Sequence, residues 1–138
     1  MKRQFDISDA FFSKTAIKAK INNTTSNKIL LNNISIAKIG IEKICLMLDM
    51  DIHITSWFRS VKLNRIVKGS LTGHPTGFCI DFVSSKYPPA KLNELIKKLT
   101  SQLAKDGIYI DQCINEYDRW THISFDFTRK RNMFFKKG

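Results

Sequence analysis

Two histidines and one aspartate are the residues of this chain best suited to binding a metal ion. His74 and Asp81 lie in one short stretch, residues 70–81, and a proline and a glycine between them favour a turn. His122 follows far downstream. Two imidazoles and one carboxylate form a three-ligand set that leaves a fourth zinc position open for water, as hydrolytic sites require. The sequence therefore predicts a zinc site made of His74, Asp81 and His122.

Two expected strands would bring these ligands together. In residues 77–83, and again in residues 120–127, large apolar residues alternate with small or polar ones, which is the pattern of a half-buried strand. Asp81 and His122 both fall on the more polar faces. If the phenylalanine-bearing faces pack on one core, both ligands point to the same side of a small sheet. His74 would join them from the turn that precedes the first strand.

Four stretches of the chain also carry a family resemblance. They are residues 5–16, residues 54–59, the motif His74-x-x-Gly77-x-Cys79-x-Asp81 and residues 111–124. In this order they resemble the zinc D-alanyl-D-alanine carboxypeptidase family, which includes bacterial cell-wall peptidases and phage endolysins and shares its fold with the Hedgehog signalling domain. The resemblance implies an α+β fold, in which helices pack on one face of a small antiparallel sheet and the zinc site lies on the other.

Three residues are candidates for substrate binding. The resemblance implies that Arg59 contacts a carboxylate of the substrate, and a planar guanidinium suits bidentate recognition of that group. Thr72 stands where the family usually has a serine two residues before the histidine, and we expect it to form a hydrogen bond near the site. Trp120 either lines the substrate cleft or packs as a core or edge aromatic.

The catalytic acid or base is the point at which this chain departs from the family. Several branches carry a carboxylate three residues before the last histidine ligand, and that position is Arg119 here. The candidates are Glu116, which the resemblance favours, and Asp118. Strand alternation puts Glu116 in phase with Ile110 and Ile114, and therefore away from the polar face, unless the turn shifts it. A metal-binding relative without activity is therefore an alternative.

The activity implied by the resemblance is zinc-dependent hydrolysis of peptidoglycan stem peptides. Both D-Ala-D-Ala carboxypeptidase cleavage and endolysin-type endopeptidase cleavage fit, and the short chain is most similar to the phage-type enzymes that lyse cell walls. One alternative is an inactive zinc-binding protein of a virion or of the wall. Another is a basic nucleic-acid-binding protein, although the sequence shows no reading helix or aromatic platform.

Composition places the chain among basic globular proteins. With 138 residues it is expected to form one domain, residues 1–138, and to be a monomer. The net charge of +11 indicates an anionic partner, such as an anionic cell-wall polymer. The basic residues near the C-terminus, 129–131 and 136–137, are interpreted as a solvated tail. The three cysteines are widely spaced and predict buried thiols rather than a disulfide framework.

The N-terminus has a basic start but no apolar run after it, and no stretch is apolar enough to cross a membrane. We therefore expect synthesis in the cytoplasm and delivery to the wall through a lysis pore or from a virion.

Hydrophobic periodicity predicts the elements that hold the site. The expected helices cover residues 10–19, 30–48, 60–67 and 90–105, and the expected strands cover residues 52–57, 77–83, 108–116 and 120–127, with a tight connection at 117–119.

Overall fold

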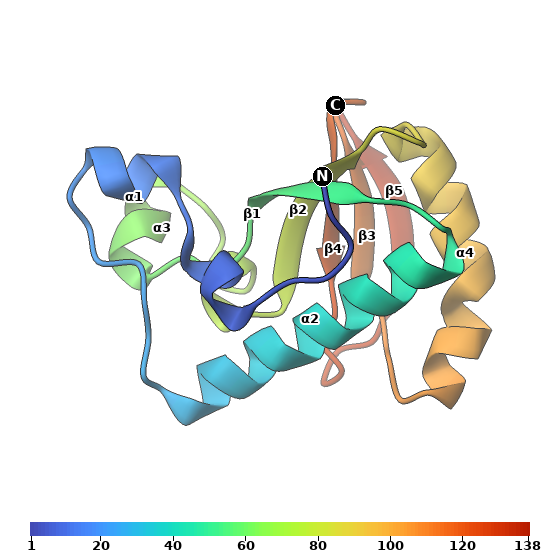
Figure 1. Ribbon diagram of the computed structural model, residues 1–138, viewed down its shortest axis with the longest axis horizontal. Coiled ribbons are helices and arrows are strands. Elements are labelled where there is room, and N and C mark those ends of the chain that lie inside the picture. The colour runs from blue at the N-terminus through green and yellow to red at the C-terminus, as the bar shows by residue number, and fades with distance from the viewer.

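The computed structural model describes the whole chain, residues 1–138. Its elements, in order, are the 3-10 helix η1 (Ile7–Phe11), α1 (Lys14–Lys18), α2 (Lys28–Met47), β1 (Ile52–Ser56), α3 (Val61–Val67), the 3-10 helix η2 (His74–Thr76), β2 (Cys79–Ser84), α4 (Pro89–Lys105), β3 (Gln112–Glu116), β4 (Trp120–Ser124) and β5 (Met133–Lys137). Figure 1 shows α1 and α3 together at one end of the molecule and α4 at the other. No helix is both long enough and apolar enough to span a bilayer.

The strands form one mostly antiparallel sheet in the order β1-β2-β4-β3-β5. Only β5 is parallel to its neighbour, β3. The predicted α+β arrangement of a small sheet with helices is confirmed at this level. Residues 136–137, interpreted as a solvated tail, are indeed exposed, but they belong to β5 rather than to a free end. That strand is held at its start by the Met133 amide, which donates to the Asp111 carbonyl at 2.9 Å.

One face of the sheet carries the core and both long helices. Apolar side chains from this face pack against buried residues of α2 and α4 in a single cluster (Figure 1). The sheet contributes Ile52, Ile80, Phe82, Cys113 and Ile123, and the two helices contribute Ile34, Ala37, Ile41, Ile44, Cys45, Leu92, Ile96 and Leu103. The opposite face is therefore free of long helices and available for a site.

A glycine inside α2 permits this close packing. Gly40 is fully within the helix, where glycine normally costs about 1 kcal/mol relative to alanine. A Cβ at this position would overlap the ring of Phe125, which is 1% exposed. Glycine is therefore needed because the helix approaches the aromatic core closely.

Several element boundaries differ from the sequence prediction. The first helix is split into η1 and α1, because the Ser13 hydroxyl accepts a hydrogen bond from the Ala16 amide and starts a new helix. The last antiparallel strand ends at Ser124 rather than residue 127, since the Asp126 carboxylate accepts from the Thr128 amide and begins a turn. Phe127, predicted on the core face, is consequently exposed.

Candidate metal centre

The register of the two central strands sets the first two ligands side by side. Asp81 of β2 and His122 of β4 are direct cross-strand partners. Such partners project from the same face of the sheet. His122 Nδ1 lies 2.7 Å from the Asp81 Oδ1 atom. The expectation that strand alternation would bring these two residues together is confirmed.

The third ligand comes from the loop before β2. His74 opens η2, which ends at Gly77, a residue in the left-handed conformation with φ of +86°. A side chain at Gly77 would meet the Leu30 carbonyl, so the turn is packed tightly against α2. His74 Nε2 reaches the Asp81 Oδ2 atom at 3.2 Å. All three predicted ligands therefore converge on one point.

The donor set fits a metal ion. One ligand atom from each of the three residues can be chosen such that all lie within 4.8 Å of one another. The Nδ1 atom of His74 lies 2.6 Å from the Trp57 carbonyl, so that nitrogen carries a proton, and Nε2 would offer its lone pair to a bound metal. Ligand atoms of a tetrahedral zinc site lie about 3.4 Å apart. The His74–Asp81 separation matches this value, whereas the shorter His122–Asp81 contact would have to open by several tenths of an ångström.

The site is electrostatically polarised around the aspartate. Burial alone would raise the pKa of Asp81, but the two imidazoles outweigh it and hold this pKa well below its usual range. Burial would likewise lower the pKa of His122, yet the hydrogen bond with Asp81, together with the nearby Cys79 sulfur, raises it to about 10. Without a metal, the pair is therefore a buried carboxylate and a protonated imidazole.

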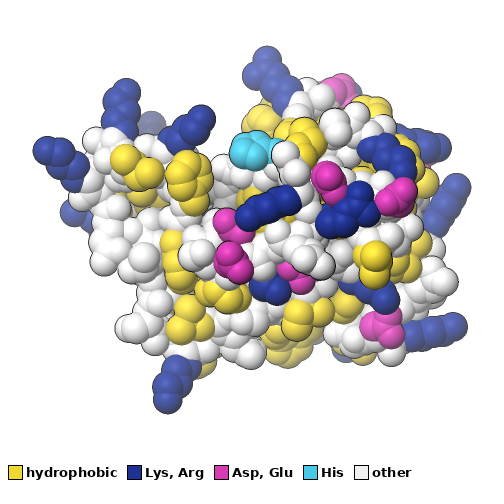
Figure 2. Space-filling view, viewed as in Figure 1, with side chains coloured by type: hydrophobic (Ala, Val, Ile, Leu, Met, Phe, Trp, Pro, Cys, Tyr) yellow, Lys and Arg dark blue, Asp and Glu magenta, His cyan; other side chains and the backbone are white.

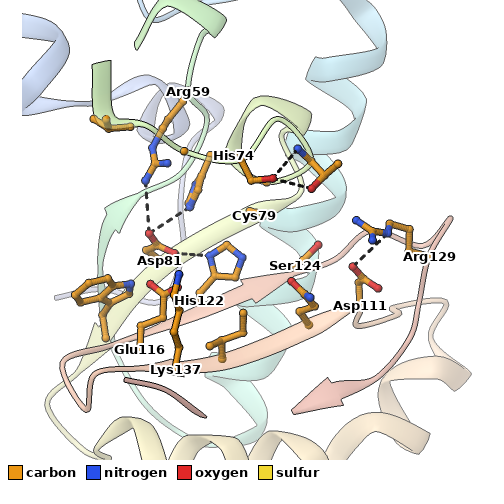
Figure 3. Close-up of a pocket in the computed structure, with 18 of the residues that line it drawn as sticks. Arg59, His74, Cys79, Asp81, Asp111, Glu116, His122, Ser124, Arg129 and Lys137 are labelled. Atoms are coloured by element: carbon orange, nitrogen blue, oxygen red, sulfur yellow. Dashed lines mark hydrogen bonds and ion pairs between the residues drawn. The ribbon is translucent and has the colours of Figure 1, made fainter. Parts of the chain in front are cut away.

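The three residues lie in the wall of a cavity of about 550 Å³. Arg59 enters the same cavity, with its Nη2 atom 3.8 Å from Asp81 Oδ2, and its side chain is 19% exposed. Burial lowers the pKa of this guanidinium, while Asp81 acts in the opposite direction. In Figure 3, Arg59 and His74 approach Asp81 from one side and His122 approaches from the other.

The other candidates for substrate contact and catalysis are distributed as follows. Thr72 and Trp120 both line the cavity. Glu116 also lines it, since its cross-strand partner is Trp120 on the site face. The expectation that Ile114 and Glu116 lie away from the polar face is wrong: Ile114 pairs with His122 and both residues line the cavity, whereas Cys113 is the core residue of β3.

The structure does not bring Asp118 into the cavity. This residue lies in the tight turn between β3 and β4, where its backbone has a positive φ of 56°. Its carboxylate accepts hydrogen bonds from the side-chain Nδ2 atom of Asn115 at 2.8 Å and from Lys136 Nζ at 2.8 Å. Asp118 is thus occupied by the turn, and of the two predicted carboxylates only Glu116 faces the site.

Sequence reasoning missed a group of charged residues at another part of the cavity wall. Asp111, Arg129, Arg131 and Lys137 all line it. Asp111 and Arg131 are twenty positions apart and come together only because β5 returns beside β3. The cluster of basic residues near the C-terminus was visible in the sequence, but its carboxylate partner was not.

Comparisons with protein-family models, with curated proteins and with solved structures find no match to this chain.

Proposed function

We propose that this protein is a zinc-dependent peptidase that cleaves stem-peptide bonds of peptidoglycan, as a D-Ala-D-Ala carboxypeptidase or an endolysin-type endopeptidase. The observation that carries the proposal is the convergence of His74, Asp81 and His122 in a cavity that also contains Arg59 and Glu116. This is the combination of a metal site, a cation for a substrate carboxylate and a free carboxylate that metal-assisted peptide hydrolysis needs. The resemblance of the motifs to the zinc carboxypeptidase family supports the choice of substrate.

The ligand set favours zinc over harder cations. Two imidazole nitrogens and one carboxylate suit zinc, while magnesium and calcium prefer oxygen ligands throughout. His74, Asp81 and His122 would hold the ion. When bound, zinc would supply Lewis-acid chemistry, polarising the scissile carbonyl and making a water molecule a better nucleophile.

Arg59 is the proposed substrate-orienting residue. Its guanidinium is largely buried and reaches Asp81 only across 3.8 Å, so its donors are not used up by a close ion pair within the chain. A guanidinium of this kind can take a substrate carboxylate in two parallel hydrogen bonds. Binding there would orient the peptide relative to the metal site.

Glu116 is the proposed acid and base. It would accept a proton from the attacking water and deliver it to the nitrogen of the leaving amine, so that one carboxyl group serves both halves of the hydrolysis. Its position at the end of β3, directly beside Trp120, places it on the same face as His122. Figure 3 shows Glu116 and Lys137 on neighbouring strands of this face.

Replacing the two candidate carboxylates separately tests this assignment. Glu116→Gln should reduce the release of amino groups from purified peptidoglycan at least about 100-fold, because general acid–base catalysis typically contributes that much, while leaving zinc content unchanged. Asp118→Asn is the matched control, since it removes a carboxylate two positions away that pairs with Lys136 and does not line the cavity. It should retain nearly full activity.

Two results would contradict the assignment. Equal loss in both variants would mean that Glu116 has no special role. A wild-type protein that binds zinc but releases no amino groups would indicate the inactive, wall-binding or virion alternative.

A further inference from the structure

Asp111, Arg129 and Arg131 form a charged group in the cavity wall, on the other side of His122 from Arg59 (Figure 3). This group has the features of a second anion-binding site. Asp111 has a side chain that is 3% exposed, and Arg131 binds it with Nε at 2.7 Å from Oδ1 and Nη2 at 3.0 Å from Oδ2. This bidentate pair neutralises the buried carboxylate and fixes the guanidinium plane. Arg131 nevertheless keeps 37% of its side chain exposed and lines the cavity.

A second arginine brings excess positive charge to the same place. Arg129 lies at the limit of an ion pair with Asp111, with its Nε atom 4.0 Å from Oδ2 and its side chain 39% exposed. Because Arg131 already satisfies Asp111, the guanidinium of Arg129 has donors free for a ligand. The turn that carries it is fixed, since the Arg129 and Lys130 amides both donate to the Asp126 carbonyl.

The position of this group relative to the metal centre follows from the sheet. The Asp111 amide donates to the Ser124 carbonyl at 2.8 Å, and Ser124 is two residues beyond His122 on β4. Two residues of a strand span about 7 Å. In Figure 3, Arg59 and Arg129 lie on different sides of the His122 ring. A peptide bound across the metal centre would therefore meet one arginine in each direction.

We propose that Arg129 and Arg131, held by Asp111, form a second carboxylate subsite that selects peptides with an acidic residue about two positions from the scissile bond. The selected group is a free carboxylate rather than its amide, because a carboxylate carries the opposite charge and accepts with two oxygens, whereas an amide presents one neutral oxygen and an NH₂ donor that a guanidinium cannot pair. This inference rests on the proposed peptidase function and specifies the substrate class of the same cavity.

The charge balance of the cavity supports an anionic ligand. Five lysine and arginine residues line it, namely Arg59, Lys68, Arg129, Arg131 and Lys137, against three carboxylates, Asp81, Asp111 and Glu116. Two of these carboxylates are already paired, Asp81 with the imidazoles and Asp111 with Arg131. The cavity therefore suits a substrate that carries more than one carboxylate.

The test compares Arg129→Gln with Lys130→Gln. Arg131 is unsuitable as the first target, because its loss would leave a buried carboxylate without a partner and endanger the fold. Lys130 is the matched control: it removes the same charge from the same turn, but it lies over the Tyr109 ring, 4.8 Å from the centroid, and does not line the cavity. The probes are two synthetic stem peptides that differ only in whether the acidic residue is a free acid or an amide.

Hydrolysis and binding are measured separately. The wild type and Lys130→Gln should favour the acid over the amide by roughly tenfold in kcat/KM, and Arg129→Gln should lose most of that preference. The same ratios should appear in calorimetric binding of reduced-amide analogues that cannot be cleaved. If neither peptide is hydrolysed, the peptidase proposal fails while the binding ratios still decide the subsite.

The subsite is overturned by any of three binding results. The wild type could bind both analogues equally, Arg129→Gln could keep the full preference, or Lys130→Gln could lose as much of it as Arg129→Gln.

Discussion

At the scale of single residues, Asp81 is the residue that contacts both histidines of the candidate metal centre. Its side chain is 10% exposed and lies within hydrogen-bonding distance of both imidazoles. An isolated carboxylate at this depth would take up a proton instead of remaining charged. The two histidines keep it ionised, and ionised is the form in which it can bind a metal.

The protonation of His122 predicts how metal affinity depends on pH. The pKa of His122 is raised from its usual value of 6.5 to about 10. Protonation of His122 therefore stabilises the metal-free fold fully at pH values below 6.5, and this contribution is lost as the pH rises through about 10. A metal ion must displace this proton. Zinc affinity should therefore increase by about tenfold per pH unit between pH 7 and pH 9.

Competition with a chromophoric chelator measures this slope. His53→Ala is the control, because His53 is an exposed histidine on β1 outside the cavity, and the variant should give the same slope as the wild type. An affinity that does not change over this pH range would contradict the proposed exchange of a proton for a metal at His122.

At the scale of elements, the close approach of α2 to the sheet is the most sensitive contact. Gly40→Ala should lower the free energy of unfolding by roughly 1–3 kcal/mol, because the added methyl group overlaps the Phe125 ring in a tightly packed core. This reverses the usual effect of replacing a helical glycine by alanine, which stabilises. Urea denaturation of the metal-free protein measures the change.

A second helix variant serves as the control. Asn32→Ala changes an exposed residue of α2 and should leave stability unchanged or slightly increased. If Gly40→Ala were as stable as Asn32→Ala, the packing of the helix against Phe125 would be looser than described.

The elements also show what the sequence can predict and what it cannot. Alternation in β2 and β4 correctly placed Asp81 and His122 on one face. Successive side chains of a strand point to opposite faces, so the large apolar residues on the core face fix the face of the residues between them. The same reasoning misjudged Ile114, which is apolar but lines the cavity. Apolar residues on both faces of β3 leave its orientation undetermined until the register with β4 is known.

The side chain of Asp118 was equally unpredictable. Its hydrogen bond with Asn115 is local, but its ion pair with Lys136 depends on β5. This strand pairs in parallel with β3 instead of pairing with β4, the strand before it in the sequence. Strand β5 is short, basic and mostly exposed, so it carries no periodic hydrophobic pattern. Without it, neither the position of Lys136 nor the pairing of Asp111 with Arg131 can be foreseen.

At the scale of the whole molecule, the positive charge is spread widely and also enters the cavity. Figure 2 shows lysine and arginine side chains projecting around the outline of the molecule, with fewer acidic ones between them. A net charge of +11 favours contact with anionic polymers in general, and such attraction weakens as salt is added. If the proposed function holds, this field would concentrate the protein at an anionic wall, whereas selection of the peptide would depend on the arginines inside the cavity.

The metal site is the central claim, and zinc content tests it most directly. Wild-type protein and His53→Ala, each incubated with zinc and then freed of excess metal, should retain about one zinc ion per chain by elemental analysis, and His122→Ala should retain almost none. The two variants each remove one histidine, so general histidine binding would affect them alike. Zinc absent from the wild type, or retained equally by His122→Ala, would contradict the account.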